Sequence, residues 1–142
     1  MLRKINHNTK LIVLDEDIIS IYGKSLIGLL GTIHYGSDVY ATVVVDVDEK
    51  KNYLYVDKIY TYFKGRRNGD YTFYDNVTEI RSDINDFEFV TDKYIHNLDK
   101  NRKGTMIFNI RKDNKFHKKD EPLKHAVRLY LGEGYDYRDP NF

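Results

Sequence analysis

The stretch VYATVVVDV, Val39–Val47, decides the fold. Every second residue from Val39 to Val47 is apolar and β-branched side chains dominate, which predicts a β-strand. The polar sequence DEKKN follows at 48–52 and is typical of a hairpin turn. Tyr53–Phe63 is rich in Tyr, Val, Ile and Thr and predicts the second strand. We therefore expect an antiparallel hairpin in the middle of the chain.

Further strands and helices are expected around this hairpin. Tyr71–Tyr74 and Thr105–Arg111 are short stretches that favour strands. Apolar residues recur at helical spacing over 15–30, 84–98 and 122–131, although Phe87–Val90 also alternates as a strand would. The pattern predicts an α+β fold: one antiparallel sheet of about four strands with two or three helices packed on it.

Length and composition limit the class of protein. A chain of 142 residues is expected to form a single domain over 1–142, with 135–142 as a loose tail. The absence of cysteine excludes disulfides and thiolate metal sites. The longest uncharged run, Ser25–Ser37, is too short to span a membrane. These features favour a cytoplasmic protein with no cofactor and no membrane partner.

Charge is distributed unevenly although the formal net charge is only +1. Asp70–Asp99 holds eight acidic and two basic residues, whereas Lys100–Arg128 holds ten basic and three acidic ones. Lysine and arginine attract phosphates, and tyrosine offers a ring for stacking and a hydroxyl for hydrogen bonding. The candidate binding residues are Arg66, Arg67, Arg102, Lys103, Arg111, Lys112, Lys115, Lys118, Lys119, Tyr60 and Tyr62.

The leading functional hypothesis is a non-enzymatic binding protein that uses this tyrosine-rich and basic surface. Its partner would be a host protein or a nucleic acid, and it would act by occlusion. The 13 tyrosines and two prolines accompany a composition typical of AT-rich genes, which favours a phage or mobile-element inhibitor of a host factor. An open four-stranded sheet would leave two unpaired edges, so a homodimer is also expected.

Two alternatives involve nucleotide chemistry. A small metal-independent endoribonuclease would need a base, an acid and a cation, for which the candidates are His117, His125, Arg128 and Tyr130. A helix after Pro122 would place His125 and Arg128 on one face. A nucleotide-sequestering protein would instead hold phosphate with its loop arginines.

A metal-dependent nuclease is weakly supported. Asp38, Asp46, Asp48, Glu49 and Lys51 have suitable side chains, but Glu49 and Lys51 fall in the expected turn, where charged residues are ordinary. The sequence contains no phosphate-binding glycine loop and no serine-hydrolase motif. No metal site is therefore predicted.

Overall fold

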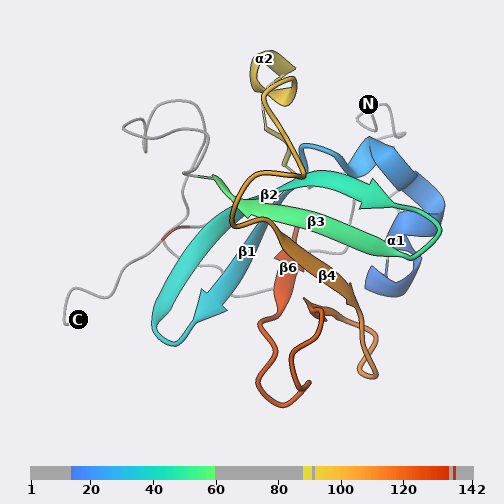
Figure 1. The fold of residues 1–142 in the computed structure, drawn as a ribbon, viewed down its shortest axis with the longest axis vertical. Helices are drawn as coiled ribbons and strands as arrows, with labels where there is room; N and C mark the ends of the chain where they lie inside the picture. The colour runs from blue at the N-terminus through green and yellow to red at the C-terminus, as the bar shows by residue number, and fades with distance from the viewer. Residues whose placement is uncertain (1–13, 60–87, 91, 135, 137–142) are drawn as a thin grey trace, which may run out of the picture.

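The computed structural model describes residues 14–59, 88–90, 92–134 and 136 (Figure 1). Most of this part of the chain forms sheet. The elements are α1 (Asp15–Tyr22), the 3₁₀ helix η2 (Gly23–Leu26), β1 (Leu30–Tyr35), β2 (Asp38–Asp48), β3 (Tyr53–Lys58), α2 (Asp92–Ile95), β4 (Met106–Ile110), β5 (Phe116–Lys118) and β6 (Leu129–Leu131).

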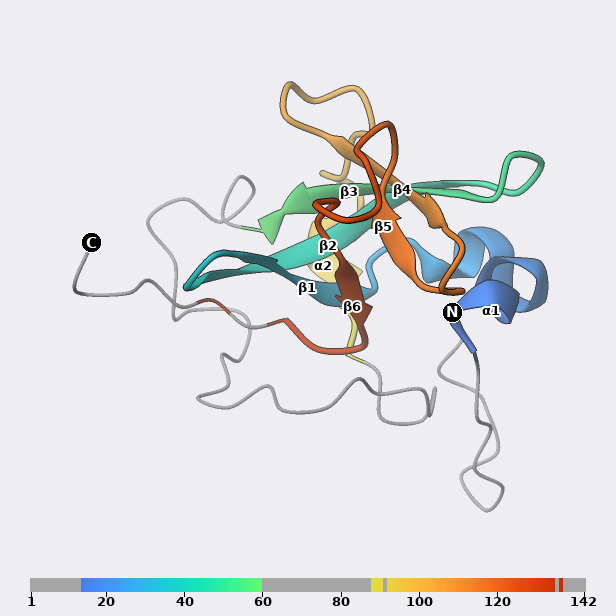
Figure 2. The same cartoon turned by 90° about the horizontal axis from the view of Figure 1, so that it is seen from below.

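The six strands form one antiparallel sheet that curls almost into a barrel (Figure 2). Their order is β5-β4-β3-β2-β1-β6, so the first five strands are an up-and-down meander and the last returns to the first. The two edge strands, β5 and β6, then meet. The N–H of Lys118 donates to the carbonyl of Val127 at 2.8 Å, and His117 forms a β-bridge with Arg128. Closure satisfies backbone groups that an open sheet would expose.

Strand β2 is buried on both faces, and a β-bulge interrupts its alternation between Val44 and Asp46. Val44 and Val47 face the enclosed core, whereas Val43 and Val45 belong to a second cluster on the outer face. The register pairs Asp46 with Tyr55, which packs against that outer cluster. A bulge adds one residue to a strand and reverses the phase of the side chains after it.

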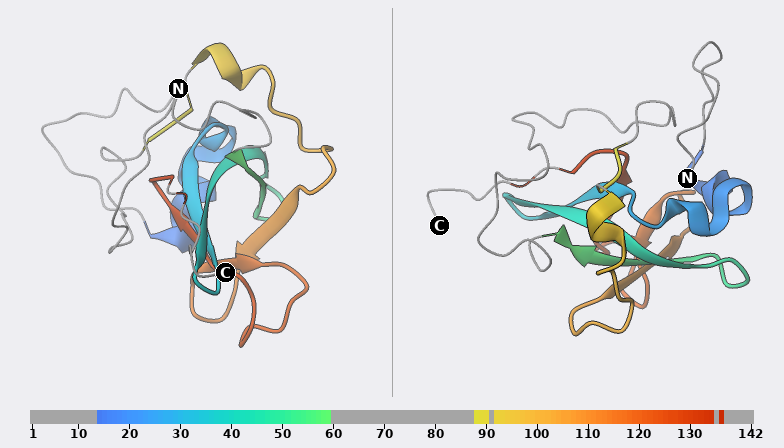
Figure 3. Two further views of the ribbon diagram at one scale, coloured as in Figure 1. Left: turned by 90° about the vertical axis from the view of Figure 1, so that its left-hand side faces the viewer. Right: turned by 90° about the horizontal axis from the view of Figure 1, so that it is seen from above.

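The barrel interior is a dense apolar core. Its largest fully buried side chains include Phe108 and Phe116 from β4 and β5, and helix α1 contributes Ile18 and Ile19. Outside the barrel, Tyr94 and Ile95 from α2 pack against the outer cluster (Figure 3). The sheet therefore separates a large enclosed core from a smaller external one.

The two ends of the barrel differ. Helix α1 lies at the end where β2 turns into β3, and the β1–β2 hairpin lies at the opposite end (Figures 1 and 2). Asp15, at the start of α1, accepts a hydrogen bond from the backbone of Phe116 and so occupies the gap beside β5. Burial raises the pKa of Asp15, and Lys115 partly opposes this shift. Helix α1 thus completes the barrel on its own side.

The expected four-stranded α+β fold with two or three packed helices is wrong. The described residues contain six strands, one eight-residue helix, the short 3₁₀ helix η2 and one helical turn at α2. The hairpin prediction is confirmed by β2 and β3 through Lys58, and the strand over 105–111 is confirmed by β4. Tyr71–Tyr74 lies outside the described residues, as does 135–142 apart from Asp136.

The helix predictions fail where glycine and proline divide the pattern. The first helix ends at Tyr22 because Gly23 adopts φ +52°, which L side chains rarely accept. Of the second, expected over 84–98, the described residues form one helical turn at α2, and Phe89 before it bridges Leu29. The third is absent: turns follow Pro122, and the chain then enters β6. Strand β6 gains hydrogen bonds to β1, and these tertiary contacts outweigh the local preference for a helix.

Closure of the sheet removes the premise for a homodimer. The expected four-stranded sheet would have left its edges free, whereas the edge strands of the observed sheet, β5 and β6, contact each other. Oligomeric state stays a prediction. Within the described part of the chain, no helix has both the length and the apolar character needed to cross a membrane.

A substitution at Gly31 tests how tightly β1 packs against its neighbouring strands. A Cβ at this position would lie 3.0 Å from Leu129 Cδ1, from Thr42 Oγ1 and from the carbonyl oxygen of Tyr130. We expect Gly31→Ala to lower the free energy of unfolding by about 1 to 3 kcal/mol, measured by urea denaturation. Gly134→Ala is the control, because its nearest contact would be an ordinary 3.4 Å. Equal stability of both variants would contradict tight packing at the β1–β6 contact.

Candidate functional site

A pocket of about 300 Å³ opens at the barrel end opposite α1, and we call it the mouth pocket. It is lined by Tyr35, Asp57, Lys58, Lys103, Gly104, Met106 and Lys118. These residues come from β1, β3, β4, β5 and the segment that leads into β4. Residues far apart in sequence therefore meet because the meander brings their strands to one end.

The strand register explains why these side chains converge. Lys58 is two residues from buried Val56, Lys118 pairs with Phe108, and Met106 pairs with Val56. Side chains that are paired or two apart share one face of a sheet. Lys58, Met106 and Lys118 therefore continue the interior face beyond the apolar core. At this end polar groups can reach solvent while their stems remain packed.

Aromatic rings form one wall beside a lysine. The Nζ of Lys58 lies 4.0 Å from the ring centroid of Tyr40 and 5.3 Å from that of Tyr35. The two rings meet edge to face at 5.7 Å, and the Tyr35 hydroxyl donates to Met106 Sδ at 3.8 Å. These cation–π contacts hold Lys58 without removing its positive charge.

The mouth pocket has a positive balance, with three lysines against Asp57. Asp57 is buried, with 2% of its surface exposed. Lys118 lies 3.7 Å from Glu121, a loose pair that keeps part of its charge available. Lys103 is exposed. The arrangement is suited to an anionic group at the rim of the pocket.

The structure separates the other predicted binding residues. Arg102 and Lys103 precede β4, whereas Arg111, Lys112 and Lys115 belong to the turn between β4 and β5. Arg111 Nη1 donates to the Lys118 carbonyl at 3.1 Å. Lys119 contacts both carboxylate oxygens of Asp120 at 3.0 Å. Arg66, Arg67, Tyr60 and Tyr62 lie outside the described residues.

His117 has a structural setting. It is 8% exposed, and its Nε2 lies 2.7 Å from Asp113 Oδ2, while its Nδ1 lies 3.2 Å from the Ala126 carbonyl. Burial alone would raise the pKa of Asp113, but hydrogen bonds from His117 and the backbone hold that pKa below its ordinary value. Both ring nitrogens are engaged, so His117 is poorly placed to transfer a proton to a ligand.

The other ribonuclease candidates lie on the outer side of β6. His125 is exposed in a turn, not on a helix beside Arg128. The guanidinium carbon of Arg128 lies 4.5 Å from the ring centroid of Tyr130, and His34 meets that ring edge to face at 5.4 Å. We call His34, Arg128 and Tyr130 the outer stack. The shared helical face expected for His125 and Arg128 is therefore absent.

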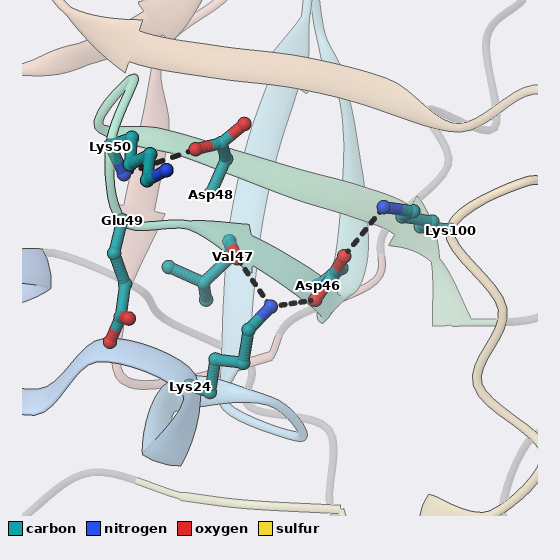
Figure 4. A pocket seen from close by; sticks show the side chains of 7 residues that line it. All are labelled: Lys24, Asp46, Val47, Asp48, Glu49, Lys50 and Lys100. Carbon is teal, nitrogen blue, oxygen red and sulfur yellow. Dashed lines mark hydrogen bonds and ion pairs between the residues drawn. The ribbon is translucent and has the colours of Figure 1, made fainter.

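A second pocket, of about 240 Å³, lies beside the bulge in β2 (Figure 4). Lys24 Nζ contacts Asp46 Oδ1 at 3.1 Å and the Val47 carbonyl at 2.9 Å, while Lys100 reaches Asp46 Oδ2 at 3.2 Å. Burial would raise the pKa of Asp46, but the backbone of Val47 and the two lysines hold it below its ordinary value. The carboxylate is thus already saturated by protein groups.

The carboxylates considered for a metal nuclease do not converge. Asp48 Oδ1 accepts the backbone N–H groups of Lys50 and Lys51 at 3.1 and 3.0 Å, which stabilises the β2–β3 turn. Glu49 points away from Asp46 in Figure 4 and lies against Gly23. Among the described residues no cluster of three or more His, Cys, Asp or Glu side chains is placed to hold a metal ion.

Sequence reasoning missed four residues that the geometry brings forward. His34 and Tyr35 end β1, a strand for which the sequence pattern gave no prediction beyond Leu30. Asp57 and Lys58 lie in a predicted strand, but which of them lines the enclosed face depends on the strand phase. The alternation in Tyr53–Lys58 was the one available signal, because it places Lys58 on the same face as Val56.

Comparisons with protein-family models, curated proteins and solved structures find no match to this chain.

An acidic pair near the end of β6 should make stability depend on pH. Burial and the nearby Glu133 raise the pKa of Glu88 to about 7, although the Gly134 N–H opposes the shift. In the unfolded chain the pKa of this carboxyl is near its ordinary value of 4.5, so stability is lost as pH rises from about 4.5 through about 7. We expect Glu88→Gln to reduce this loss of stability with pH. At pH 8 the variant should be more stable than the wild type by about 1 to 2 kcal/mol, a value that allows for solvent screening of the carboxyl.

Urea denaturation at pH 5 and pH 8 measures this effect. Glu16→Gln, a change at an exposed carboxyl, is the control and should keep the wild-type difference between the two pH values. A Glu88→Gln variant with the wild-type difference would show that Glu88 does not carry the dependence.

Proposed function

We propose that the protein is a non-enzymatic binding protein that holds the phosphates of a nucleic acid at the mouth pocket. The observation that carries this proposal is the convergence of Lys58, Lys103 and Lys118 around one cavity of about 300 Å³. Lysine neutralises phosphate as a compact charge with three rotatable donors. Tyr35 adds a ring beside those charges, which a base or sugar can contact.

Specific contacts support nucleic acid over a generic anion. Tyr35 presents an exposed aromatic ring beside the lysines, and the bases of a nucleic acid have ring faces that inorganic phosphate lacks. A ligand that presents both phosphates and bases can contact the lysines and this ring together. The pocket therefore matches the mixed chemistry of a nucleotide unit.

Binding is favoured over cleavage by the setting of His117. Its two ring nitrogens contact Asp113 and Ala126, so the residue expected as acid or base serves the β5–β6 contact instead. The endoribonuclease therefore remains the weaker candidate. Nucleotide sequestration would use the same pocket, and it predicts that a mononucleotide binds as tightly as an oligonucleotide.

A protein of this type would act by occlusion in the cytoplasm, covering a strand that another factor needs. Neither cofactor nor catalytic turnover is required for that action. The degree of inhibition would depend on how much of the strand the protein has bound.

Charge removal at the mouth pocket tests the proposal. We expect Lys103→Gln with Lys118→Gln to weaken binding of a labelled single strand of about 12 nucleotides at least tenfold at low salt. The slope of log affinity against log salt should become shallower by about 0.7 for each lysine removed. Fluorescence anisotropy across a salt series measures both quantities.

The matched control removes two lysines from the same basic stretch. Lys112→Gln with Lys119→Gln leaves the mouth pocket intact, and its affinity should stay within about twofold of the wild type. Equal losses of affinity in both double variants would show that the overall charge of the basic stretch, and not the mouth pocket, carries binding. Strand cleavage by the wild type without metal would instead favour the endoribonuclease.

A further inference from the structure

The outer stack stands beside the mouth pocket but is not part of it. His34 and Tyr35 are consecutive at the end of β1, and consecutive side chains of a strand point to opposite faces. Tyr35 therefore lines the pocket, while His34 lies outside against Tyr130. Only the width of one strand separates the two groups of rings.

We propose that the outer stack and the mouth pocket form one continuous surface for a single-stranded nucleic acid. This inference rests on the function proposed above and extends it to the form of the ligand. Phosphates contact the lysines of the mouth pocket, and a neighbouring base stacks on Tyr130 and His34. The strand passes over the end of β1 between the two.

The outer stack has the chemistry that a base requires. Arg128 holds the Tyr130 ring by a cation–π contact, with 4.5 Å between the guanidinium carbon and the ring centroid. Among the described residues Arg128 forms no ion pair, and it acts on Asp15 only through a longer-range electrostatic attraction. Burial lowers the pKa of His34, so its ring is largely uncharged at neutral pH. A neutral ring and a positive plane then flank one tyrosine.

A single strand fits better than a duplex or an acidic peptide. In a duplex the bases stack on one another, and their faces are not available to protein rings. An acidic peptide could neutralise the lysines, but its carboxylates would gain nothing from His34 and Tyr130. Stacking with electrostatic tracking of the backbone is the mode by which proteins bind single strands.

The test compares ligand length with the loss of one ring. Tyr130→Leu keeps apolar bulk but removes the stacking surface, and we expect it to bind a labelled oligonucleotide of about eight residues at least tenfold more weakly. Its affinity for a dinucleotide, which reaches only the mouth pocket, should not change. Tyr53→Leu removes a ring from β3 that lies in neither group and is the control.

A salt series distinguishes stacking from a general loss of structure. Tyr130→Leu should lower affinity with the wild-type salt slope, whereas Lys118→Gln, which removes a phosphate contact, should make the slope shallower by about 0.7. Both variants are compared by urea denaturation, so that a folding defect is seen separately. DNA and RNA strands of one sequence are tested in parallel, and binding of either supports the inference.

The outcomes separate this inference from the proposed function. If wild-type protein binds the strand through Lys103 and Lys118 but Tyr130→Leu binds equally well, the outer stack is overturned and the mouth pocket stands. If no strand binds, both fail. Tighter binding of duplex than of single strand, or equal competition by poly-glutamate, would also overturn the inference.

Discussion

The β-bulge between Val44 and Asp46 is the constraint on which the barrel depends. Without the bulge, strict alternation would place Asp46 on the same face as Val44, inside the enclosed core. A carboxylate buried there would cost several kcal/mol, because apolar side chains cannot replace its hydration. The extra residue turns Asp46 to the outer face, where Lys24 and Lys100 contact it, and returns Val47 to the core. One local irregularity thus reconciles a charged residue with a strand buried on both faces.

The same bulge contributes to closure, since bulged strands bend and twist more strongly than regular ones. A curled meander brings β5 back toward β6, where the Lys118–Val127 hydrogen bond and the His117–Arg128 bridge join them. Beside that short contact, Asp15 from α1 accepts the N–H of Phe116. Helix α1 therefore helps to close the barrel at one end, and backbone hydrogen bonds between β5 and β6 close it farther along. The opposite end has no comparable helix among the described elements, and the mouth pocket opens there.

The sequence predicted the elements whose signals are local. The β2–β3 hairpin has β-branched alternation and a polar turn, in which Asp48 bonds the next backbone N–H groups and Asn52 accepts φ 62°. Strands β5 and β6 are three residues long, too short for any alternation to be recognised. They exist because partners distant in the chain supply their hydrogen bonds. Leu129 and Leu131 therefore fit a helical spacing in the sequence and a strand in the structure.

The candidate site was partly predictable for the same reason. Residue type identified Lys103 and Lys118 as anion-binding groups, but only the register shows that Lys118 continues the interior face while Lys119 does not line the pocket. The +7 balance of Lys100–Arg128 likewise overstates the charge available to a ligand. Lys119 is engaged by Asp120, and Lys100 by Asp46.

The positive charge at the mouth depends on placement more than on composition. A protein with net charge +1 exerts little long-range attraction on nucleic acid, and salt screens exposed charges beyond about 8 to 10 Å. Affinity must then come from short-range contacts: lysines at a cavity and rings that are held in place before a ligand arrives. Lys58 between Tyr35 and Tyr40, and Arg128 over Tyr130, are held in this way. Because these groups are already ordered, a ligand loses less side-chain entropy on binding them than it would on a flexible basic tail.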